Sequence, residues 1–295
     1  MNRTIYDLIG LSAGVMFILA LKGLSHPRTA RRGNLLGALG ATVTTLAVFF
    51  YVSDPAEKNG SLPLNNLGWI LGAIAFGVVV GVPAARKVQM TAMPQLVALF
   101  NGVGGGAAAL VAIVEYLKLG DSATTAEVIA TVFTVLVGCT SFSGSIVTFL
   151  KLQELMTTRP VVFPGGRFVI AATLGGTIAS AVWVINALGT TPLLVLAGLS
   201  LLFGVLFVLP VGGADVPIVI SLLNAFTGLT VAAGGYVLDA TLLIVAGTLV
   251  GASGTILTRL MAEAMGRSLF GTLFGAFTAK PQDSAGAAET RPVKS

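Results

Sequence analysis

The stretch RKVQMTAMPQLVALFNGVGGGAAAL (residues 86–110) decides the architecture that this sequence predicts. It leads from two cations through a short polar segment into an apolar run, which is typical of a chain entering a membrane. Pro94 suits the first turn of a helix, and Asn101 then lies about two turns inside it, among glycines at 102 and 104–106. An unpaired amide in lipid costs several kcal/mol, and a helical glycine costs about 1 kcal/mol relative to alanine. Both features therefore need a functional or packing reason.

The composition indicates a polytopic membrane protein. Of the 295 residues, 55% are hydrophobic and only 10% are charged, which is too little polar surface for a soluble protein of this length. The net charge of +5 does not indicate nucleic-acid binding, because the cations lie in short segments between apolar runs. The single cysteine, Cys139, and the single histidine, His26, cannot form a disulfide framework or a Cys/His metal site.

Nine apolar segments of about 20 residues, the length that crosses a bilayer, can be counted along the chain. Each is predicted to be a helix, because a bilayer excludes open sheets and the alternation of a barrel strand is absent. The first is expected to span the membrane and not to be a signal peptide, since it lacks a cleavage site of small residues. The predicted fold is an all-α polytopic bundle of about nine transmembrane helices over 1–277, followed by a polar linker at 278–295. The segments are 4–24, 34–52, 67–85, 93–117, 126–150, 167–188, 191–210, 216–237 and 239–264.

The cations predict the orientation, because cytoplasmic loops of membrane proteins are enriched in Lys and Arg. Nine spans place the termini on opposite sides, and the loops on the C-terminal side collect 14 of the 17 cations. We therefore expect an external N-terminus and a cytoplasmic C-terminus. The cytoplasmic set is Lys22, Arg28, Arg31, Arg32, Arg86, Lys87, Lys151, Arg159, Arg167, Arg259, Arg267, Lys280, Arg291 and Lys294, and the external set is Arg3, Lys58 and Lys118.

Two pairs of segments echo each other. MPQLVALFN (93–101) matches VPIVISLLN (216–224), each with proline second and asparagine seven residues later, and SGSIVT (143–148) matches SGTILT (253–258). Each asparagine would lie about 10 Å along its helix from the proline. Asn101 and Asn224 are therefore expected at similar depth, facing one shared interior. Chance similarity in Gly- and Ser-rich membrane sequence is the alternative.

Polar side chains inside the spans are the candidates for function. Asn101 and Asn224 lead, with helix–helix hydrogen bonding as the alternative role for each. Ser145 and Ser253 come from the repeated triplets and are candidate hydroxyls of a water path, although hydroxyls also bond to the carbonyls of their own helix.

Two acids lie near the ends of spans. Glu115 is either the external mouth of a proton path or a member of an interfacial ion pair. Asp215, in VGGADVP (211–217), either caps the next helix or belongs to a tight turn on which a soluble domain docks. The glycines after Asn101 are no dinucleotide loop, because they follow no strand, and no Walker sequence is found in the chain.

Four blocks of the sequence resemble the membrane part of the β subunit of proton-translocating NAD(P) transhydrogenase. They are MTAMPQLVALFNGVGGGAAALVA (90–112), FSGSIVTFLKL (142–152), GGADVPIVISLLNAFTG (212–228) and VAGTLVGASGTILTRLMAEAMGRS (245–268). The resemblance covers almost all of residues 1–277. It implies a multi-pass component of the inner (plasma) membrane that couples inward proton movement to hydride transfer from NADH to NADP+.

The resemblance also implies partners and residue roles. In this family an α subunit binds NAD(H), an NADP(H)-binding domain follows the β membrane domain, and two α–β units form a dimer. Asn224 matches a path asparagine, Ser145 a path hydroxyl and Asp215 an acid linked to coupling. With Arg259 and Arg267, Asp215 is expected to couple the membrane domain to the soluble one.

Two departures from the family pattern change these expectations. Asn101 stands where many members carry a titratable histidine, and an amide takes up no proton at physiological pH. The ionising group is therefore expected on a histidine of a neighbouring α-subunit membrane segment, with the glycines letting that segment come close. The sequence also ends in the linker where the NADP(H)-binding domain is expected, so this chain alone is predicted to bind neither NADP(H) nor NAD(H).

A secondary transporter of small solutes is the alternative function, suggested by duplicated helices and polar groups at mid-membrane depth. No span is clearly broken and no charge is available at that depth for a coupled ion, which favours the proton conduit. A structural membrane scaffold is a third class.

Overall fold

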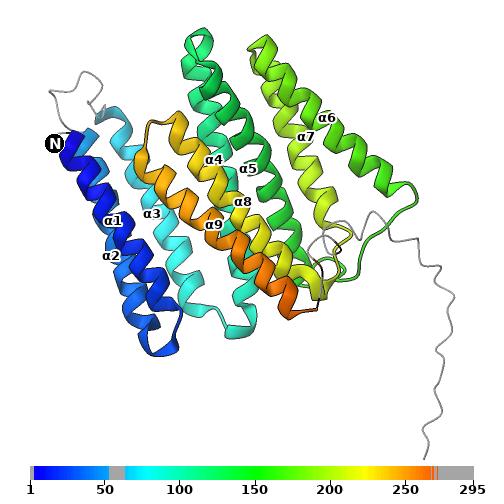
Figure 1. The fold of residues 1–295 in the computed structure, drawn as a ribbon, viewed down its shortest axis with the longest axis horizontal. Helices are drawn as coiled ribbons and strands as arrows, with labels where there is room; N and C mark the ends of the chain where they lie inside the picture. The colour runs from blue at the N-terminus through cyan, green and yellow to red at the C-terminus, as the bar shows by residue number, and fades with distance from the viewer. Residues whose placement is uncertain (1–2, 53–63, 267, 269–270, 272–295) are drawn as a thin grey trace, which may run out of the picture.

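The computed structural model describes residues 3–52, 64–266, 268 and 271. Within them the chain forms nine long helices, three short 3-10 turns and no strand (Figure 1). The prediction of an all-α membrane bundle is confirmed. The long helices are α1 (Arg3–Leu24), α2 (Pro27–Val52), α3 (Leu64–Lys87), α4 (Met93–Leu119), α5 (Thr125–Leu152), α6 (Gly166–Ala187), α7 (Thr190–Val208), α8 (Val216–Val237) and α9 (Thr241–Ala264).

Eight of the nine described helices are long and apolar enough to cross a membrane. The exception is α2, a 26-residue helix beside α1 whose first turns carry three arginines. It begins at Pro27 and not at residue 34 as predicted, because its polar first turns give no hydropathy signal. Lys58 of the predicted external set and the linker at 278–295 lie outside the described residues, and the sidedness of the termini stays a prediction.

The helices form a central group with a pair on each side (Figure 1). α4, α5, α8 and α9 pack together in the centre, where α5 contacts both α4 and α8. The α1–α2 pair joins this group through α9, and the α6–α7 pair joins it through α5. No helix of the described chain packs along α3, and no residue of its spanning stretch is buried.

The central helices begin with clear local signals. α4 and α8 each follow a 3-10 turn, η1 (Met90–Ala92) and η3 (Gly213–Asp215), and each has proline in its first two positions. The echo between these two segments therefore extends to the backbone. α5 begins with a capping box, in which the Thr124 hydroxyl and the Glu127 carboxylate satisfy each other's backbone N–H groups.

Glycines let the central helices touch backbone to backbone. A Cβ atom added at Gly138 of α5 would lie 2.8 Å from the carbonyl oxygen of Gly105 on α4. One added at Gly228 of α8 would lie 2.6 Å from the amide nitrogen of Gly251 on α9. Small residues at such crossings are how membrane helices gain packing energy, since lipid is as apolar as leucine.

Candidate functional site

A polar layer joins α4 to α5 at Asn101. This side chain is 8% exposed, and its Nδ2 donates to Ser145 Oγ at 2.9 Å and to Ser141 Oγ at 3.3 Å. The sequence predicts Asn101 and Ser145 as separate candidates, and the structure places them in direct contact.

The layer continues from α5 to α8. Ser141 Oγ lies 2.6 Å from Thr227 Oγ1 and 3.0 Å from the carbonyl oxygen of Leu223, to which Thr227 also donates at 3.0 Å. A hydroxyl carries one proton and two lone pairs. Ser141 therefore accepts from Asn101 and can donate either to Thr227 or to Leu223, so the hydrogen bonds of the layer have two arrangements.

The amide oxygen of Asn101 is the unsatisfied atom of the layer. Oδ1 is buried, and no donor among the described residues reaches it. A buried acceptor without a donor costs about 1–3 kcal/mol. The site therefore has room in its hydrogen bonding for a donor from water or from another chain.

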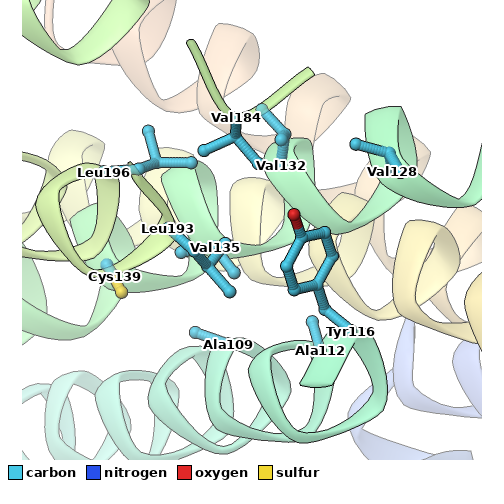
Figure 2. Packing of buried hydrophobic residues seen from close by; sticks show 10 residues of the cluster. All are labelled: Ala109, Ala112, Tyr116, Val128, Val132, Val135, Cys139, Val184, Leu193 and Leu196. Atoms are coloured by element: carbon cyan, nitrogen blue, oxygen red, sulfur yellow. The ribbon is translucent and has the colours of Figure 1, made fainter. Parts of the chain in front are cut away.

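Two apolar clusters enclose the layer. One lies toward the C-terminal end of α4, where the Tyr116 ring rises toward Val132 of α5 (Figure 2). The other surrounds Leu223 and the start of α8. Along α4 and α5 the layer falls between the two clusters, and hydrogen bonds in such surroundings are stronger than in water. The clusters are Ala109, Ala112, Tyr116, Val128, Val132, Val135, Cys139, Val184, Leu193 and Leu196, and Ala98, Val147, Val208, Val211, Val216, Val219, Ile220 and Leu223.

The glycines that follow Asn101 serve the contact with α5. A Cβ atom on Gly102 would lie 3.1 Å from the Cβ atom of Ser145, and one on Gly105 would lie 3.1 Å from the Gly138 carbonyl oxygen. The expectation that these glycines admit a segment of another subunit is therefore wrong for Gly102 and Gly105, because α5 of the same chain fills the space.

The other two predicted path residues lie outside the layer. Asn224 is half-buried on α8, three residues before Thr227, and its amide has no hydrogen-bond partner among the described residues. Ser253 is exposed on α9 and donates to the Val250 carbonyl of its own helix at 3.2 Å. The structure does not bring Ser253 to Asn101.

The predicted charged residues lie toward the helix ends. Glu115 accepts a salt bridge from Lys118 at 3.1 Å, the arrangement of the interfacial alternative. Asp215 occupies the N-cap position of α8, the place that the capping alternative gives it, but makes no side-chain cap hydrogen bond. Arg259 is exposed and pairs with Glu263 at 2.8 Å, while Arg267 lies outside the described residues.

Comparison with known proteins identifies the family. A family model described as NAD(P) transhydrogenase beta subunit matches residues 6–295. Two relatives named NAD(P) transhydrogenase subunit beta, from Rhodospirillum rubrum and from one strain of that species, are each 39% identical to the chain over 291 residues. The chain belongs to the NAD(P) transhydrogenase beta subunit family. The match covers 96% of this chain and 61% of each relative, so the chain spans about three fifths of their length.

Sequence reasoning missed several polar residues of this transhydrogenase-family chain. Thr227 completes the layer, and a second polar contact joins α8 to α9, where Thr258 donates to Ser221 Oγ at 3.0 Å. A signal for the layer, though not for Thr227 itself, was available on α5, because hydroxyl and glycine positions recur there every three or four residues on one buried face. That row is Thr131, Thr134, Gly138, Ser141, Ser145 and Thr148.

Lys151 needs a correction as well. The orientation count assigns it to a cytoplasmic loop, but it lies in the last turn of α5 and is fully buried.

Proposed function

We propose that this chain is the proton-conducting membrane component of NAD(P) transhydrogenase, coupling inward proton movement to hydride transfer from NADH to NADP+. The observation that carries the proposal is the layer formed by buried Asn101, Ser145 and Ser141 and half-buried Thr227, which lies between two apolar clusters. One of its acceptors, Asn101 Oδ1, meets no donor among the described residues. Family membership supports it.

In the proposed mechanism this layer hydrogen-bonds to the group or water that carries the proton and does not itself ionise. An amide and hydroxyls stay neutral at physiological pH, so the titrating group must come from outside the layer. Asn101 Oδ1 is a buried acceptor for a water, and this water is protonated by a histidine on an α-subunit membrane segment. Because Ser141 has two hydrogen-bond arrangements, the hydroxyls of Ser141 and Thr227 can reorient when the proton moves.

α8 is the proposed link to nucleotide chemistry. It carries Thr227 and the half-buried Asn224 in the membrane, and its N-terminal end follows Asp215 directly. A shift of α8 would therefore reach a docked NADP(H)-binding domain through Asp215, with Arg259 at the same end of the bundle. Arg267 is proposed to act with them. The described residues contain no strand and hence no strand–turn–helix unit of the kind that holds a dinucleotide. No hydride step is therefore assigned to them.

The proposed assembly is a dimer of α–β units in the inner membrane, with NAD(H) and NADP(H) bound by the soluble parts. The full-length chain should be co-expressed with its α subunits, and reverse transhydrogenation measured in inverted vesicles with and without a pH gradient. Asn101→Leu removes both donor bonds of the layer and is expected to lower coupled turnover about tenfold or more, the effect of roughly 1.4 kcal/mol on a barrier. Asn224→Leu is expected to act in the same direction.

Asn186→Leu is the matched control. This asparagine on α6 is exposed and donates only to the Val182 carbonyl of its own helix, at 2.8 Å. Assembly and turnover should match the wild type. Wild-type coupled turnover in Asn101→Leu, with normal assembly, would remove the layer from the proton path.

A further inference from the structure

Lys151 ends α5 as a buried ammonium. The residue is 0% exposed, and its Nζ donates to the carbonyl oxygens of Val208 at 3.2 Å, Leu209 at 2.5 Å and Val211 at 2.8 Å. No salt bridge to Lys151 forms among the described residues. The three donors of the ammonium are therefore matched by three carbonyls from one short segment.

The convergence of three carbonyl oxygens explains why a charged donor, with three N–H bonds, lies there. Val208 is the last residue of α7, and Leu209 and Val211 follow it, at the negative end of the helix dipole. The Val208 and Leu209 oxygens each also accept one backbone N–H, from Val211 and Val161, so Lys151 uses their second lone pairs. A neutral amide serves a single carbonyl at the end of α5, where Gln95 Nε2 donates to the Leu152 oxygen at 3.1 Å. Burying a cation costs several kcal/mol. Three hydrogen bonds from one Nζ atom to three carbonyl oxygens offset the cost of burying this ammonium.

The segment that Lys151 holds is the α7–α8 connector, residues 209–215. A second segment holds it from elsewhere: Val161 N–H donates to the Leu209 oxygen at 3.1 Å, and Gly213 N–H donates to the Thr158 oxygen at 2.9 Å. The connector ends in η3 and Asp215, and α8 begins at the next residue. Lys151 thus ties the end of α5 to the entry of α8, the two helices that share the polar layer.

We propose that Lys151 is a positioning residue that fixes the α7–α8 connector, and that its three carbonyl partners form a monovalent-cation site which the side chain itself fills. When the side chain is removed beyond Cβ, these carbonyls are left to bind a small cation such as ammonium or potassium. This proposal deepens the proposed function, because it names the residue that holds the connector leading to Asp215. It rests on the proposed function only where coupled turnover is measured.

Hydrogen–deuterium exchange of the full chain in lipid nanodiscs tests the positioning role. Lys151→Ala and Lys151→Met are expected to speed amide exchange in 209–217 about tenfold or more, because a charged donor is lost from three carbonyls. Lys151→Gln keeps two N–H donors on a neutral side chain that is one atom shorter, so a smaller increase is expected. Lys118→Met is the control, since that cation is 66% exposed and lies at the other end of the bundle; exchange in 209–217 should not change.

Chemical rescue separates the cation site from a general packing effect. Ammonium or potassium chloride should restore slow exchange in Lys151→Ala but not in Lys151→Met, whose side chain fills the space, and tetramethylammonium chloride should restore neither. Wild-type exchange in both variants, or a loss that no cation reverses in Lys151→Ala, would overturn the proposal. If Lys151→Ala does not fold in any salt, Lys151→Gln provides the test. Amide exchange in residues 209–217 of Lys151→Gln at the wild-type rate would also overturn the proposal.

The second readout is coupled turnover of the assembled enzyme, in which Lys151→Gln is expected to be slower than the wild type at unchanged assembly. Exchange requires neither the α subunits nor proton transport. A failure of the positioning role is therefore distinguishable from a failure of the proposed function. Faster exchange with wild-type coupled turnover would contradict the role of the connector in coupling.

Discussion

Substituting Gly228 by alanine tests whether the α8–α9 hairpin depends on direct contact of two backbones. The new Cβ atom would lie 2.6 Å from the Gly251 nitrogen and 2.9 Å from Val250 Cγ1. Favourable separations of such atoms are about 3.5–4.0 Å, so the helices must part by roughly 1 Å. Overpacking of this kind costs about 1–3 kcal/mol, against a gain of at most about 1 kcal/mol from the helix propensity of alanine. With that full gain subtracted, we expect a net loss of up to about 2 kcal/mol in the free energy of unfolding.

The measurement is the unfolding free energy of the chain in bicelles, by steric trapping with a pair of biotin labels. The matched control is Gly72→Ala on α3, where a Cβ atom would meet no described heavy atom within 4 Å. That variant should be as stable as the wild type or slightly more stable. Equal unfolding free energies for Gly228→Ala and Gly72→Ala would refute the argument.

Two further changes test the hydrogen bonds around the central helices. Thr124→Ala breaks the capping box with Glu127 and is expected to cost about 1 kcal/mol, seen as faster amide exchange in the first turn of α5, whereas Thr124→Ser should keep the cap. Thr258→Val removes the 3.0 Å bond to Ser221 and should cost about 0.6 kcal/mol in unfolding free energy, while Ser253→Ala, on the exposed face of α9, should cost nothing measurable. Equal effects of the two α9 variants would contradict the burial pattern of that helix.

The helices were predictable because a single physical requirement marks them. A segment that lies in lipid must be apolar for about 20 residues, and that requirement is local in sequence. The start of α2 departs from the prediction for the same reason, since helical turns that carry Arg28, Arg31 and Arg32 satisfy their backbone without being apolar.

The site was predictable only in its residue types. That Asn101 meets Ser145 depends on how α4 is rotated against α5, and this rotation is set by the close approach at Gly102 and Gly105. Ser253 shows the limit of the internal echo. Its counterpart Ser143 is buried because α4, α7 and α8 surround α5, whereas the outer side of α9 is exposed.

Lys151 was counted as a loop cation because charges at the ends of spans usually reach back to water. Its three carbonyl partners lie 57, 58 and 60 residues further along the chain. No local pattern could reveal them.

The isolation of α3 makes this helix a place to attach a probe. The chain has a single cysteine, Cys139, and its side chain is buried. A cysteine placed at Gly72 would take a maleimide dye or a nitroxide without displacing any described neighbour, while the native thiol stays shielded. Oxygen and nickel-chelate accessibility of such a spin label would then distinguish α3 surrounded by lipid from α3 covered by another subunit.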